Sequence, residues 1–161
     1  MSDAQRQFRY KANIKKHLSQ LRHLTGRELS PTDLITLAET DLLRERSRKL
    51  ERLPIRRFSV PFAERNGKLM KDLINKIHGA YQSRIYLWTE LANTCGAVWL
   101  DSILDFNFEF DFEIDANGVF ALESEDLRQK LLLDFSEVES GKLLEVEVSG
   151  DVWGAIEPAG D

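Results

Sequence analysis

The first part of the chain spaces its apolar residues as an amphipathic helix does. Between residues 10 and 24 they recur every three or four positions, so they share one helical face. The members of this stripe are Tyr10, Ile14, Leu18, Leu21 and Leu24. Gly26 follows the stripe, and a left-handed glycine commonly ends a helix. The pattern therefore predicts a first helix that ends at Gly26.

Two further helices are predicted over residues 31–52 and 67–94. Ser30 followed by Pro31 is a favourable helix start, because serine caps the end and proline fits the first helical position. The apolar stripe of the second helix is Leu34, Leu37, Ala38 and Leu42. The third helix has the longest stripe, which consists of Met70, Leu73, Ile74, Ile77, Tyr81, Ile85, Trp88, Leu91 and Cys95. Between these helices we expect a connector over residues 54–66 that Val60 and Phe62 hold to the core.

The second half of the chain changes to a period of two. Residues 106–115 alternate strictly between apolar and polar side chains, which predicts a strand with one buried face. Asn117-Gly118 predicts a hairpin turn, and residues 119–123, 131–136 and 144–149 predict three more strands. Strands joined by short turns form an antiparallel meander, and only the helices can cover its apolar face.

The expected fold class is therefore α+β, with an N-terminal three-helix segment packed on a C-terminal four-stranded antiparallel β-meander. At 161 residues the length predicts one domain over residues 1–161, with a helical half (1–95) and a sheet half (96–161).

Composition narrows the class without naming a function. Hydrophobic residues make up 42% of the chain and charged residues 30%, which is typical of a globular protein. Cys95 is the single cysteine, so an intrachain disulfide is excluded, and we expect a buried thiol there. No signal peptide and no run long enough to cross a bilayer are visible. These features predict a cytoplasmic protein.

The charge is distributed unevenly along the chain. Residues 1–90 contain 19 Lys and Arg against 10 Asp and Glu, whereas residues 91–161 contain 3 against 17. One interpretation is that the two halves pack together and neutralise each other. The other is that the surplus of acidic residues forms a surface for a basic partner.

The candidate binding residues are the acidic side chains of the predicted strands. They are Glu109, Asp111 and Glu113 on the first strand, Asp134 on the third, and Glu145 and Glu147 on the last. Folding does not require so many carboxylates there, and like charges on neighbouring strands repel. We therefore expect a basic protein partner, with Trp99 and Trp153 as candidate aromatic anchors. The alternative is an outer sheet face that only keeps the protein soluble.

Other chemistry finds little support in the sequence. Phosphate loops, dinucleotide-binding fingerprints and the common hydrolase motifs are absent, so we expect no enzymatic activity and no cofactor. His17, His23 and His78 do not complete a metal set. Residues 113–118 resemble the start of a calcium loop, but Glu113 stands where aspartate is expected and Ser124 where the bidentate glutamate belongs. A plain turn explains this segment better.

The combination resembles the immunity proteins of bacterial contact-dependent inhibition and related polymorphic toxin systems. Residues 106–115, the Asn117-Gly118 turn and residues 143–149 carry the resemblance, which is one of pattern and covers roughly the C-terminal third. It implies a protein that binds one cognate toxin, a nuclease among the options, and blocks its active site. These proteins share no fixed signature, so no functional residue can be transferred from them.

Two alternatives remain open. A regulator associated with nucleic acid would use the basic cluster between Arg44 and Arg57, although the acidic pI of about 5.3 makes nucleic acid the less expected partner. A secretion chaperone or adaptor would bind an extended segment at a sheet edge. The sequence does not decide between a monomer and a homodimer.

Overall fold

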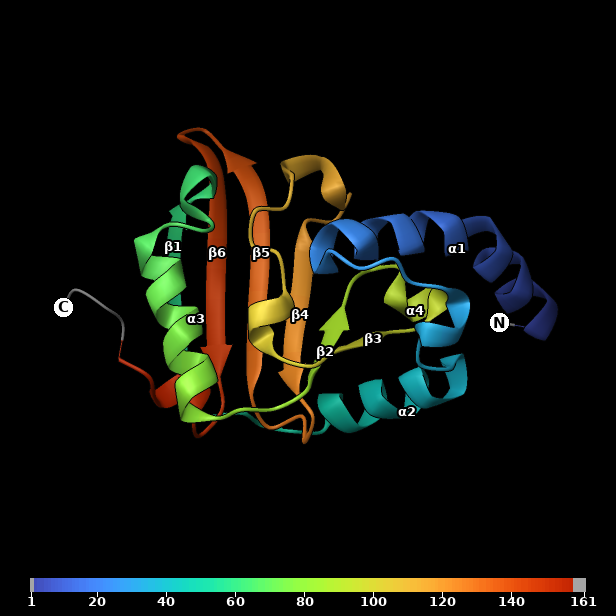
Figure 1. Cartoon of the computed structure of the whole chain (residues 1–161), viewed down its shortest axis with the longest axis horizontal. Coiled ribbons are helices and arrows are strands. Elements are labelled where there is room, and N and C mark those ends of the chain that lie inside the picture. Colours follow the sequence, from blue (N-terminus) through green and yellow to red (C-terminus); the bar gives the residue numbers. More distant parts are fainter. Residues whose placement is uncertain (1, 158–161) are drawn as a thin grey trace.

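The computed structural model describes residues 2–157 and contains one antiparallel sheet with helices on both faces (Figure 1). The strands are β1 (Ile55–Pro61), β2 (Ile85–Trp88), β3 (Val98–Leu100), β4 (Val119–Ser124), β5 (Lys130–Val138) and β6 (Gly141–Ser149). Among the described residues the sheet has six strands, in the order β1-β6-β5-β4-β2-β3.

The helices divide between the two faces of the sheet. Helices α1 (Asp3–Thr25) and α3 (Lys68–Ala80) contribute to the main hydrophobic core on one side, which we call the inner face. Helix α2 (Leu37–Arg48) packs on the opposite side, the outer face, where Leu43 joins a second, smaller core with Tyr86 and Leu127. This second core lies at the β2 and β3 end of the sheet, beside the short helix α4 (Ala92–Cys95) (Figure 1).

The α+β class is confirmed, with helices concentrated in the N-terminal part and antiparallel strands in the C-terminal part. The expected three helices and four strands are wrong in number. Two strands, β1 and β2, come from the part of the chain that was assigned to helices and a connector. No helix within residues 2–157 is both long enough and apolar enough to cross a membrane.

The first helix follows the prediction closely. The Ser2 hydroxyl accepts from the Gln5 amide, and the Gln5 side chain accepts from the Ser2 amide, so both ends of a capping box are present. Gly26 ends the helix with a φ of 68°. Only the C-terminal end of the apolar stripe is fully buried, at Leu21 and Leu24.

The second helix starts later than expected. Ser30 does cap a helical turn, but that turn is a 3-10 segment of three residues, Pro31–Asp33. The chain then extends because the amide of Ile35 donates to the carbonyl of Ala97 at 2.9 Å. Helix α2 begins after Thr36 and buries Thr40, Leu43 and Ser47, while Leu42 of the predicted stripe is 61% exposed.

The predicted third helix is three elements instead of one. Helix α3 ends at Ala80, residues 85–88 form β2, and residues 92–95 form α4. Ile85, Tyr86 and Leu87 are all buried because β2 is a central strand with protein on both faces. A short run of apolar residues fits a helix stripe and a buried strand equally well, so periodicity alone does not distinguish them.

The predicted connector contains an edge strand. Residues 55–61 pair antiparallel with β6, from Ile55 opposite Ser149 to Pro61 opposite Leu143. Pro61 is tolerated because it lies at the end of an edge strand. Val60 and Phe62 are buried, as expected.

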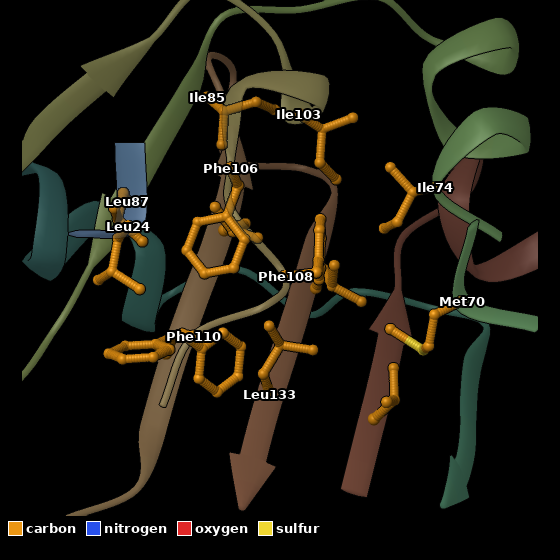
Figure 2. Close-up of a cluster of buried hydrophobic side chains, with 14 of the residues drawn as sticks. Leu24, Met70, Ile74, Ile85, Leu87, Ile103, Phe106, Phe108, Phe110 and Leu133 are labelled. Atoms are coloured by element: carbon orange, nitrogen blue, oxygen red, sulfur yellow. The ribbon is translucent and has the colours of Figure 1, made fainter. Parts of the chain in front are cut away.

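The segment at residues 106–115 alternates as predicted but is not a strand. Phe106, Phe108 and Phe110 are buried, yet this segment pairs with no strand and ends in a 3-10 turn, Phe112–Ile114. It crosses the inner face of the sheet, where the Phe110 ring lies 5.2 Å from Phe120 and 5.0 Å from Phe135 (Figure 2). Aromatic packing against the sheet therefore replaces backbone pairing.

Asn117-Gly118 is not the hairpin turn that its sequence suggests. Gly118 has a φ of 67°, and its carbonyl accepts from the amide of Phe135 at 2.8 Å. A Cβ at this position would lie 2.3 Å from the Phe135 carbonyl oxygen, so the close approach to β5 requires glycine. The later part of the meander is confirmed, since β4, β5 and β6 are neighbours. The turn between the last two is Glu139-Ser140, because Gly141 already pairs with Val138.

Candidate functional site

The structure separates the six candidate carboxylates into two groups on opposite faces. Asp134, Glu145 and Glu147 lie on the outer face of β5 and β6. Glu109, Asp111 and Glu113 lie in the segment that crosses the inner face, and they are exposed because the phenylalanines between them turn toward the sheet. Because residues 106–115 form no strand, the sheet brings together Asp134, Glu145 and Glu147 and leaves the other three candidates apart from them.

The outer group forms a compact acidic surface. Asp134 and Glu145 lie directly opposite each other on β5 and β6, and Ser59 of β1 is the partner of Glu145 on its other side. Glu147 is two residues further along β6 and accepts from the Arg57 Nε at 3.0 Å. Together these residues line a depression of about 360 Å³ whose floor includes Leu132. We call these five residues, Arg57, Ser59, Asp134, Glu145 and Glu147, the acidic patch.

The pair at the centre of this patch has no counter-charge of its own. Within residues 2–157, no Lys, Arg or His nitrogen lies within 4.0 Å of the carboxylates of Asp134 and Glu145. Like charges placed directly opposite each other across a strand pair destabilise a sheet. The patch is therefore a place where added positive charge lowers the free energy.

The inner group is more dispersed. Glu109, Asp111 and Glu113 line a depression together with Lys16 and His23 of α1. Glu113 lies 3.8 Å from the Lys142 Nζ, and that ammonium also lies 4.6 Å from the Phe112 ring. Basic side chains of this same chain are thus close to the inner carboxylates.

The basic cluster between Arg44 and Arg57 does not present one surface. Arg52 is buried and donates to Glu123, Ser47 and the Leu127 carbonyl. Arg56 donates to the Gly154 carbonyl, and Arg57 belongs to the acidic patch. The remaining basic residues of this cluster are Arg44, Arg46 and Arg48 of α2 and Lys49 directly after it.

The two candidate aromatic anchors and the single cysteine are buried or partly buried in the fold. Trp153 is 1% exposed and belongs to the main core, whereas Trp99 is half-buried under Arg84. Cys95 is buried as expected, and burial raises the pKa of its thiol. In the described part of the chain, no group of three or more His, Cys, Asp or Glu side chains is arranged to hold a metal ion.

Two members of the acidic patch, Arg57 and Ser59, were not predicted to lie beside the candidate carboxylates. Arg57 and Ser59 reach it because residues 55–61 form a strand beside β6. Residues 58–60 alternate between apolar and polar side chains, and this short pattern could have indicated the strand. Comparison with models of protein families, with curated proteins and with solved structures finds no match to this chain.

Proposed function

We propose that this chain binds a basic protein partner through the acidic patch and acts as an immunity protein that neutralises a cognate bacterial toxin. The observation that supports the proposal is the opposed pair of Asp134 and Glu145, which faces outward and has no ion-pair partner among the described residues. A partner that inserts a lysine or arginine between them relieves their repulsion and forms charge-assisted hydrogen bonds.

The position of the patch suits a protein partner. Helix α2 covers the β2 and β3 end of the outer face, and β5, β6 and β1 remain uncovered beside it (Figure 1). The uncovered face combines carboxylates with the partly exposed Leu132. Protein interfaces usually combine apolar contacts with a polar rim, and this depression has Leu132 next to its carboxylates.

The proposed mechanism is occlusion steered by charge. Carboxylates on a rigid sheet take the places that phosphates occupy in the substrate groove of a nuclease, so the bound chain excludes nucleic acid from that groove. Complementary charge accelerates encounter with a basic partner and makes the association rate sensitive to salt.

The test compares two double variants that remove the same charge from opposite faces. Asp134→Asn with Glu145→Gln removes the outer pair, and Asp111→Asn with Glu109→Gln removes two inner carboxylates. Association with the purified cognate toxin domain is measured at low and moderate salt, together with protection of growing cells from that toxin. We expect the outer variant to associate about tenfold more slowly and to protect less, and the inner variant to match wild type.

Two results would contradict this proposal. Equal association rates for the outer variant and wild type would exclude the patch as the contact surface. Binding of the wild-type chain to DNA at low salt would also contradict it, if no protein is found that binds wild type and fails to bind the outer variant. The basic residues of α2 would then be the candidate contact surface.

The free energy of unfolding is measured for both variants. Removing the repulsion between Asp134 and Glu145 is expected to stabilise the fold by a few tenths of a kcal/mol.

A further inference from the structure

A second concave region of the outer face lies between α2 and β4. It has a volume of about 350 Å³ and is lined by Arg44 and Arg48 of α2, Trp88 of β2 and Lys130 of β5. Ser47 and Glu123 lie at its floor. We call this region the basic groove. Ala121 of β4 pairs with Leu132 of β5, and these two residues separate the groove from the acidic patch.

The cations of the basic groove lack carboxylate partners. Among residues 2–157, Arg44, Arg48 and Lys130 have no carboxylate oxygen within 4.0 Å. Glu123 is the nearest buried acid, but its oxygens already accept from Arg52 at 3.1 Å and from the Ser47 hydroxyl at 2.9 Å. Glu90, which also lines the groove, is exposed. The groove therefore keeps a surplus of positive charge.

Arg44 is oriented by neutral groups only. Its guanidinium donates to the Asn93 side-chain oxygen and lies 5.9 Å from the centre of the Trp88 ring. Partial burial lowers the pKa of this guanidinium, Asp41 opposes that change, and the charge of Arg48 adds to the lowering. Arg44 and Arg48 are four residues apart on α2, so their like charges lie on the same side of the groove, where a bound anion reduces their repulsion.

Trp88 provides an independent observation. Its indole Nε1 is buried, and no acceptor among the described residues lies within hydrogen-bonding distance. Buried indole N–H groups usually have a partner. Trp88 therefore lines the groove beside three cationic side chains, with the exposed Glu90 as the lining acid that does not pair with Arg52.

We propose that the basic groove binds a phosphate group, either as free inorganic phosphate or as the phosphate of a mononucleotide. A phosphate has several strong acceptor oxygens, and arginine and lysine are the side chains that bind it best. The volume falls at the lower end of the range for small-molecule sites. The site is independent of the proposed immunity function, because it uses none of the residues of the acidic patch.

The test follows the indole N–H signals of the ¹⁵N-labelled chain by nuclear magnetic resonance. Inorganic phosphate, pyrophosphate and adenosine monophosphate are titrated at constant pH and ionic strength, with chloride as the reference anion. Trp88→Phe identifies the Trp88 signal among those of the three tryptophans. We expect this signal to move and saturate with phosphate compounds, and Trp153 in the core to stay unchanged.

Matched charge variants test whether phosphate binds in the basic groove. Arg44→Gln and Arg48→Gln each remove one cation from the groove, and Arg46→Gln removes one from an exposed position of the same helix. We expect about tenfold weaker binding for each groove variant, which corresponds to about 1.4 kcal/mol, and less than twofold for the control. Circular dichroism and thermal unfolding check that all variants remain folded.

The two phosphate sources predict different outcomes. Adenosine monophosphate that binds more than tenfold tighter than inorganic phosphate, with quenching of Trp88 fluorescence, assigns a nucleotide to the groove. Equal affinities assign phosphate alone. A Trp88 signal that does not respond to any of the three compounds overturns the proposal, and so does an equal loss of binding in the Arg46 control.

Discussion

His17 is a titratable residue enclosed by protein. It is 1% exposed, and its Nε2 lies 2.7 Å from the Gly96 carbonyl oxygen. Because a carbonyl only accepts, Nε2 has the proton and Nδ1 is an acceptor without a partner among the described residues. Burial lowers the pKa of this imidazole, and the hydrogen bond to Gly96 opposes the change. The folded state therefore favours the neutral form.

This preference makes stability depend on pH in a definite direction. In the unfolded chain His17 takes up a proton near pH 6.5, whereas in the folded chain it does so only at lower pH. The contribution of neutral His17 to the free energy of unfolding is therefore fully present above about pH 6.5 and declines as the pH falls below that value. We expect His17→Gln to remove this part of the decline between about pH 7 and 5. Urea unfolding at several pH values measures it, with the exposed His23→Gln as the control. Identical pH profiles for wild type and His17→Gln would contradict the assignment.

At the scale of elements, the phenylalanine-rich segment shows that an alternating apolar and polar pattern occurs both in strands and in segments that pair with no strand. Residues 106–111 have the alternation of a strand, and their side chains do alternate between core and solvent. The backbone nevertheless lies over the inner face of the sheet instead of at its edge (Figure 2). Alternation predicts the direction of side chains, but the location of a backbone partner depends on residues far away in the chain.

Phe110 is the residue on which this crossing depends most. It is 1% exposed, and its ring contacts those of Phe62, Phe106, Phe120 and Phe135. We expect Phe110→Ala to lower the free energy of unfolding by about 3–5 kcal/mol, because it removes a large buried ring and leaves a cavity. Phe8→Ala is the matched control, since Phe8 is 74% exposed, and should cost less than about 0.5 kcal/mol. Urea unfolding compares the two; similar losses would exclude the packing argument.

At the scale of the whole molecule, the uneven charge is neutralised in some places and left without ion pairs in others. Among residues 2–157, three ion pairs join the basic first half to the acidic second half: Arg52–Glu123, Arg56–Glu157 and Arg57–Glu147. The halves thus neutralise each other locally. The pair of Asp134 and Glu145 lies outside this neutralisation, which is why the acidic patch remains the candidate contact surface.

The buried pair of Arg52 and Glu123 connects the end of α2 to β4. Their side chains are 9% and 4% exposed, and the nitrogen and oxygen lie 3.1 Å apart. Burial raises the pKa of Glu123, although Arg52 and Ser47 act in the opposite direction. We expect Arg52→Met to destabilise the fold by about 3–5 kcal/mol, since it leaves a buried carboxylate without compensation. Chemical denaturation measures this loss.

A second variant separates charge from packing at this position. Arg52→Met combined with Glu123→Met should recover much of the stability, because two apolar side chains leave no charge buried. Arg46→Met, at an exposed position of α2, should change stability by less than about 0.5 kcal/mol. A double variant no more stable than Arg52→Met alone would show that shape, and not charge, dominates at this contact.

The sequence by itself determined which side chains are buried along α3, β5, β6 and residues 106–110, where the first helix ends and how β4, β5 and β6 follow one another. These properties depend on neighbours within a few residues: the helical or alternating period, the conformation of Gly26 and the turn at Gly141. Only the tertiary structure decided that residues 55–61 and 85–88 are strands and that residues 106–111 are not. A strand needs hydrogen-bond partners from distant parts of the chain, and local pattern does not specify them. For the same reason, only the fold could place Asp134 and Glu145 together and the other candidate carboxylates on the opposite face.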